Sequence, residues 1–108
     1  MAWHEAGSVA EWNVGAGREL LIAGRVVAIF RTAEGFLAVD GMCAHQGGPI
    51  AQGDLDHNCV TCPWHGWQYD ITDGVNLLTH KKMLDCFKVE LRGDSVWIEV
   101  TALSAGTG

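Results

Sequence analysis

Two short segments that each combine a cysteine with a histidine constrain the fold of this chain more than any other feature. The first, CAHQGG, contains Cys43 and His45, and the second, CPWHGWQYD, contains Cys62 and His65. Each segment lies between stretches that are typical of β-strands, so each is expected to be a loop. Two loops that each offer a thiolate and an imidazole form a four-ligand set, and a metal centre bound by this set would tie the loops together.

A mixed set of two cysteines and two histidines serves either a structural zinc ion or a two-iron, two-sulfide cluster whose second iron is bound by histidines. The residues around the two pairs favour the cluster. Glycines next to the ligands let the backbone approach bridging sulfides and donate N–H groups to them, a proline stiffens the second loop, and aromatic side chains can shield the centre. These cofactor-binding candidates are Gly47, Gly48, Pro63, Trp64, Gly66, Trp67 and Tyr69.

The pattern C-A-H followed by C-P-W-H-G-W resembles the Rieske [2Fe–2S] family in the order and separation of its two boxes. The resemblance covers most of the chain. It implies an all-β fold, in which an antiparallel β-sandwich base carries a small cluster-binding subdomain at about residues 41–75, within a single domain 1–108. It also implies one Rieske [2Fe–2S] cluster, with one iron held by Cys43 and Cys62 and the other by His45 and His65.

The chain departs from the Rieske proteins of respiratory complexes at three positions. Those proteins carry an extra cysteine in each box, and the two cysteines form a disulfide; Gly48 and Trp64 stand there in this sequence. Trp67 replaces a serine that donates a hydrogen bond to sulfur in those proteins, whereas Tyr69 keeps a tyrosine donor. Fewer donors stabilise the reduced cluster less, so the resemblance implies a ferredoxin of the low-potential type.

Short strands between glycine-marked turns dominate the rest of the sequence, whereas helix signals are weak. A capping-box pattern predicts about one helical turn at residues 8–11, and residues 77–84 are expected to be a loop or a single turn. β-Branched and aromatic residues, alternation and turn residues predict strands at 18–23, 25–32, 36–39 and 69–72. Asp73-Gly74 is a hairpin signal after the last of these strands, and a second hairpin is predicted over 88–100 with its turn at Gly93-Asp94.

Charge and hydropathy limit the possible partners. The 108 residues carry a formal net charge of −6, which argues against nucleic acid and against anionic membrane surfaces. No signal-peptide pattern is present, and the longest unbroken apolar run, Val26–Phe30, is far too short to cross a bilayer. These features predict a cytoplasmic protein without a membrane partner, and the small polar tail 102–108 is expected to be flexible.

A Rieske cluster carries one electron, and the 108 residues contain neither a catalytic iron domain nor a flavin or nicotinamide fingerprint. We therefore expect an electron-transfer component and not an enzyme. The first hypothesis is a ferredoxin that passes electrons from a flavin reductase to a terminal, aromatic-ring-hydroxylating oxygenase. The alternative is the small Rieske subunit of an assimilatory nitrite reductase, and a zinc-bound structural or interaction module is a distant third.

Several chemically notable residues lie outside the two boxes. Cys59 forms a Cys-x-x-Cys spacing with Cys62, but we interpret Cys59 as a small packing residue in the strand that enters the second loop, and Cys86 in the same way. Lys81 and Lys82 are interpreted as an ordinary solvated face, with a docking site as the alternative.

Overall fold

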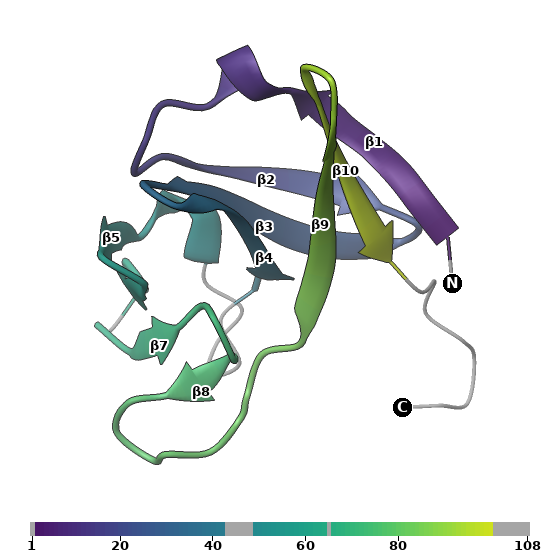
Figure 1. Cartoon of the computed structure of the whole chain (residues 1–108). Coiled ribbons are helices and arrows are strands. Elements are labelled where there is room, and N and C mark those ends of the chain that lie inside the picture. The colour runs from purple at the N-terminus through teal and green to yellow at the C-terminus, as the bar shows by residue number, and fades with distance from the viewer. Residues whose placement is uncertain (1, 43–48, 65, 101–108) are drawn as a thin grey trace.

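The structure is a computed structural model that describes residues 2–42, 49–64 and 66–100 (Figure 1). These residues form antiparallel sheets and two single-turn 3₁₀ helices, η1 (Val9–Glu11) and η2 (Ile50–Gln52), and they contain no α-helix. The predicted all-β, antiparallel fold class is confirmed. The larger sheet has six strands in the order β1 (Ala2–Ser8), β10 (Ser95–Val100), β9 (Cys86–Arg92), β4 (Gly35–Asp40), β3 (Arg25–Thr32) and β2 (Gly17–Ile22). The smaller sheet has four strands in the order β5 (Asp54–Asp56), β6 (Cys59–Thr61), β7 (Gln68–Asp70) and β8 (Val75–Asn76).

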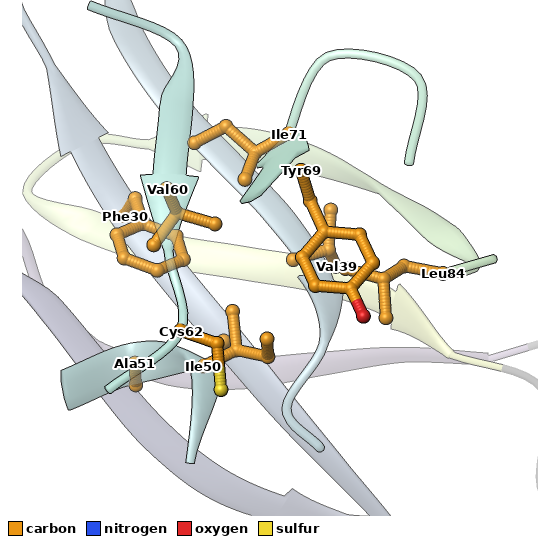
Figure 2. Close-up of a cluster of buried hydrophobic side chains, with 10 residues drawn as sticks. Phe30, Val39, Ile50, Ala51, Val60, Cys62, Tyr69, Ile71 and Leu84 are labelled. Carbon is orange, nitrogen blue, oxygen red and sulfur yellow. The ribbon is translucent and has the colours of Figure 1, made fainter. Parts of the chain in front are cut away.

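Strand β3 is the centre of the molecule because it is buried on both faces. Successive side chains of a strand point to opposite faces, so the apolar run in β3 contributes to two cores. Val27 and Ile29 pack with residues of β10 in one core. Ala28 and Phe30 pack in the second core, which lies against the four-stranded sheet (Figure 2). The second core is therefore what joins the small sheet to the larger one.

The strongest sequence patterns match the observed strands closely. Strand β3 has the predicted bounds, and the predicted terminal hairpin appears as β9 and β10. The capping box at η1 is also present: Glu11 accepts a hydrogen bond from the Ser8 N–H, and the Ser8 hydroxyl accepts one from the Ala10 N–H.

Two strands, β1 and β5, were not predicted. Strand β1 lacks clear alternation, and its partner is β10, at the far end of the chain, with Ala2 opposite Val100. Strand β5 is three residues long and is formed by pairing with β6. Both strands depend on partners that a local pattern does not reveal.

The described residues include no helix that could span a lipid bilayer. The predicted tail, 102–108, lies outside the described residues.

Candidate metal centre

The base of the first cysteine–histidine segment is fixed to the large sheet. Met42 and Pro49 form an isolated β-bridge on either side of the segment. Beside this bridge the Ile50 N–H donates to the Gly41 carbonyl at 3.0 Å, and the Gly41 N–H donates to the Val26 carbonyl of β3 at 2.9 Å. The chain therefore enters and leaves the first segment at one place. The predicted site residues within it, Cys43, His45, Gly47 and Gly48, lie outside the described residues.

An ion-pair clamp fixes the end of β4, immediately before the first segment. The Arg25 guanidinium donates to Asp40 and to Asp85, each at 2.9 Å, and it lies over the Phe87 ring. The Asp85 N–H donates to Asp40 at 2.7 Å, so the clamp also holds the chain that enters β9. The Arg25 side chain is largely buried, which gives the pairs more weight than an exposed ion pair would have.

The second segment begins where β6 ends and returns into β7. The Cys62 N–H donates to the Trp67 carbonyl at 2.7 Å, which extends the β6–β7 ladder by one step beyond the Thr61–Gln68 pair. Cys62 is 1% exposed, so its sulfur is in an apolar environment. Pro63 and Gly66 are exposed, Trp64 is 49% exposed, and His65 lies outside the described residues.

One buried core supports the bases of both segments. Cys62 packs in it with Ile50 and Ala51, which follow the first segment, and with the fully buried Tyr69 of β7 (Figure 2). Trp67 is half-buried and packs against the same core. Figure 2 shows the Cys62 sulfur and the Tyr69 hydroxyl directed toward the same end of this core. A buried thiol, a buried phenol in the same core and an apolar wall between two closed loop bases fit a shielded cluster site, because low polarity around the ligands limits solvent access.

Cys59 does not share a face with Cys62. Val60 and Cys62 both point into the core, and Cys59 lies on the opposite side of β6 because side chains alternate. Burial raises the pKa of the Cys59 thiol above its ordinary value, and the carboxylates of Asp70 and Asp56 raise it further. Cys59 and Cys62 are therefore not placed as a chelating Cys-x-x-Cys pair.

Cys86 begins β9, opposite Val39, and packs against the same core as Cys62. Burial raises the pKa of its thiol, an effect that Lys82 partly opposes. Cys59 and Cys86 are both free thiols. Within residues 2–42, 49–64 and 66–100, no three Cys, His, Asp or Glu side chains are grouped so that they could hold a metal ion, so this part of the chain offers no alternative ligand set.

Replacing Cys59 or Cys86 by alanine is expected to leave the visible spectrum and the iron content of the protein unchanged, and to lower the free energy of unfolding by about 1 kcal/mol or less. In the wild-type protein, both thiols should react slowly with iodoacetamide at pH 7, because a raised pKa keeps them protonated, and faster as the pH rises through the alkaline range. Mass spectrometry of alkylated peptides measures this rate. Loss of iron in Cys59→Ala would show that the ligand set is wrong.

A hollow beside the second segment was not expected from the sequence. Leu77 and Leu78, which follow β8, line a hollow of about 370 Å³ together with Gly66, Trp67 and Gln68. The segment 77–84 has some helix formers but no caps, so the sequence predicted a loop or a single turn. Two adjacent leucines in such a loop were the only signal of an apolar surface there.

Comparisons with known proteins agree with this geometry. The family described as the Rieske [2Fe-2S] domain matches residues 2–88. The oxygenase component of 3-ketosteroid-9-alpha-monooxygenase from Mycolicibacterium smegmatis is 32% identical over 68 residues, which are 62% of this chain and 18% of that protein. Cholesterol 7-desaturase nvd from Xenopus laevis is 33% identical over 82 residues, which are 72% of this chain and 18% of that protein. The chain thus spans less than a fifth of the length of these relatives.

Two solved structures share the fold over nearly their whole length. The ferredoxin of carbazole 1,9a-dioxygenase from Nocardioides aromaticivorans IC177 has a TM-score of 0.83 at 16% identity, covering 91% of this chain and 97% of that chain. A structure described as an NADH-dependent nitrite reductase small subunit from Mycobacterium tuberculosis has a TM-score of 0.86 at 19% identity, covering 94% and 97%. The family match contains both cysteine–histidine segments, whose bases lie on one core. This chain therefore belongs to the Rieske [2Fe-2S] domain family.

Proposed function

We propose that this chain is a one-electron carrier of the Rieske ferredoxin type. One observation carries the proposal: the bases of two cysteine–histidine segments, distant in sequence, meet on a single buried core that contains Cys62 and Tyr69. A Rieske domain holds one [2Fe–2S] cluster, and when bound this group supplies the reversible uptake of a single electron. We propose that the chain transfers electrons and does not transform a substrate by itself.

In this proposal the residues have the following roles. Cys43 and Cys62 bind one iron as thiolates, and His45 and His65 bind the other through imidazole nitrogens. The hydroxyl of the buried Tyr69 would donate toward the sulfur ligands, and the apolar core around it would exclude water from one side of the site. Gly47, Gly48 and Gly66 would let backbone N–H groups approach the bridging sulfides, Pro63 would stiffen the second loop, and Trp64 and Trp67 would shield the site.

In the same proposal, residues 1–108 form a single Rieske domain with a cluster-binding subdomain at about 41–75. Its partners are redox proteins: a flavin reductase as donor and a terminal, ring-hydroxylating oxygenase as acceptor, in the cytoplasm. Support comes from the shared fold with the carbazole dioxygenase ferredoxin and from the oxygenase components among the relatives. A second candidate, the small subunit of an assimilatory nitrite reductase, is favoured by the similarity to the mycobacterial structure.

The test of the carrier role begins with the purified protein. Chemical analysis should find two irons and two sulfides per chain in a reddish-brown protein that dithionite reduces and air reoxidises reversibly. Each partner hypothesis is then tested by adding the reductase together with either the oxygenase or the nitrite reductase catalytic subunit from the same genome. Electron flow that depends on this chain in only one of the two mixtures identifies the system.

The midpoint potential is expected near the low end of the Rieske range, roughly −150 mV. Reduction adds a negative charge, and residues 32–80 contain no Lys or Arg to compensate it. Carboxylates of Asp54, Asp56, Asp70 and Asp73 lie on or next to the small sheet that carries the second segment. Trp67 also stands where the high-potential proteins have a serine donor.

A redox titration followed by visible absorbance measures this potential. Replacing Tyr69 by phenylalanine should shift it further negative, because one donor to sulfur is lost and the ring is kept. A clearly positive wild-type midpoint would contradict the low-potential assignment.

A further inference from the structure

The loop that follows β8 lies at the end of the molecule far from the β9–β10 turn (Figure 1), and it contains two exposed leucines. Leu77 is 40% exposed and Leu78 is 78% exposed. Together with Gly66, Trp67 and Gln68 of the second ligand segment they line the hollow of about 370 Å³. This volume is large enough to receive an apolar side chain from another protein. Covering the hollow would remove apolar surface from water, which favours association.

This loop is a preformed turn and not a frayed connection, because the buried Asn76 organises it. The Asn76 side-chain oxygen accepts hydrogen bonds from the N–H groups of Leu78 and Thr79, at 2.8 and 3.0 Å. The Asn76 backbone accepts from the His80 N–H at 2.8 Å and donates to the Lys81 carbonyl at 2.9 Å. The leucines are therefore held outward before any partner arrives, which lowers the entropy cost of docking.

Positive charge follows the leucines along the chain. Lys81 and Lys82 are the only Lys or Arg residues in the segment 32–87, which includes both cysteine–histidine pairs. Both lysines are exposed, and so is the neighbouring His80. The chain as a whole carries a formal charge of −6, and Lys82 lines a separate hollow together with Asp85 and Glu99, so the positive charge of residues 77–82 lies at their C-terminal end. An interface with an apolar centre and charged groups at its rim is the usual arrangement at protein–protein contacts.

We propose that residues 77–82 are a docking surface for a redox partner whose own contact face is apolar at its centre and rimmed by carboxylates. The proposal rests on the electron-carrier function and adds to it the kind of partner surface and its place on this chain. In the step that follows docking, one electron leaves the reduced protein and enters the partner. This protein is oxidised and the partner reduced by one equivalent, and no bond to a substrate is made or broken.

The experiment uses two haem proteins as acceptors, cytochrome b5 as an acidic probe and cytochrome c as a basic one. Dithionite-reduced holoprotein, freed of excess reductant, is mixed with each acceptor in a stopped-flow instrument, and the second-order rate constant is measured against ionic strength. With cytochrome b5, Lys81→Glu is expected to lower the rate constant at low salt by about tenfold. With cytochrome c the same substitution should raise the rate constant. Both changes should shrink as salt is added.

Arg92→Glu is the matched control for charge, since it changes the net charge equally but lies beside the β9–β10 turn. Leu78→Ser should also slow electron transfer to cytochrome b5, but independently of salt, and its control is Leu91→Ser at a leucine that is 51% exposed on β9. Only variants whose visible spectrum matches that of the wild-type protein are used. The rate constants of both controls are expected to lie within about twofold of the wild-type value.

Equal rate constants for Lys81→Glu and Arg92→Glu, or for Leu78→Ser and Leu91→Ser, would overturn the docking surface. In that case the wild-type protein would still be reduced and reoxidised reversibly, so the carrier function would stand. A protein that dithionite does not reduce reversibly would instead overturn the carrier function, and the docking surface with it.

Discussion

Replacing Cys62 by serine is expected to yield colourless protein that lacks stoichiometric iron and sulfide, and the same result is expected for Cys43→Ser and His65→Ala. The four ligands come from two segments that are distant in sequence, so the binding free energy of the cluster also orders these segments. We expect amide hydrogen exchange to accelerate across residues 41–75 in each variant, with β3, β4 and β10 still protected. Iron and sulfide analysis, visible absorbance and hydrogen exchange measure these effects.

Cys59→Ser is the matched control for Cys62→Ser. The chemical change is the same and the two residues belong to the same stretch of chain, but Cys59 points away from the core that contains Cys62. Cys59→Ser should keep its colour and its iron. A full complement of iron and sulfide in Cys62→Ser would overturn the ligand assignment, and loss of iron in both variants would mean that the strand, and not a ligand, had been damaged.

Gly74→Ala is expected to destabilise the protein strongly. Gly74 has φ = +78°, and an added Cβ would lie 2.0 Å from the Leu84 carbonyl oxygen. The Gly74 carbonyl also accepts hydrogen bonds from the N–H groups of Met83 and Leu84, so the backbone cannot move away without breaking them. We expect a loss of about 3 kcal/mol or more in the free energy of unfolding, which for a domain of this size lowers Tm by about 12 °C or more. Thermal unfolding of the holoprotein measures it.

Gly24→Ala separates backbone strain from crowding in this prediction. Gly24 has φ = +80°, almost the value at Gly74, but its added Cβ would meet nothing within 4 Å. Gly24→Ala should therefore lower the free energy of unfolding only by the strain of a left-handed backbone, about 1–2 kcal/mol. If Gly24→Ala and Gly74→Ala lower the free energy of unfolding equally, the close approach of Leu84 to Gly74 does not add to the cost of the substitution.

The sequence by itself determined the family and the most regular strands. Strand β3 was predicted with its observed bounds, because a run of β-branched and aromatic residues between glycines is a strong local signal. The β9–β10 hairpin followed from alternation on both sides of Gly93-Asp94. The two cysteine–histidine pairs identified the family, since ligand type and spacing are properties of the sequence itself. The ligand roles of Cys43, His45, Cys62 and His65 stay predictions: Cys62 is buried at the base of the second segment, and the other three residues lie outside the described part of the chain.

The tertiary structure decided which residues meet. Strand β1 becomes a strand because β10 lies beside it, and a pairing between the two ends of the chain leaves no local pattern. The opposite faces of Cys59 and Cys62 depend on the register of β6 against β7, which turns every second side chain toward the core. The position of Leu77 and Leu78 against Gly66 depends on the turn that the buried Asn76 organises. Strand propensity and turn chemistry act over a few neighbouring residues, whereas edge pairing and packing are set by contacts across the whole chain.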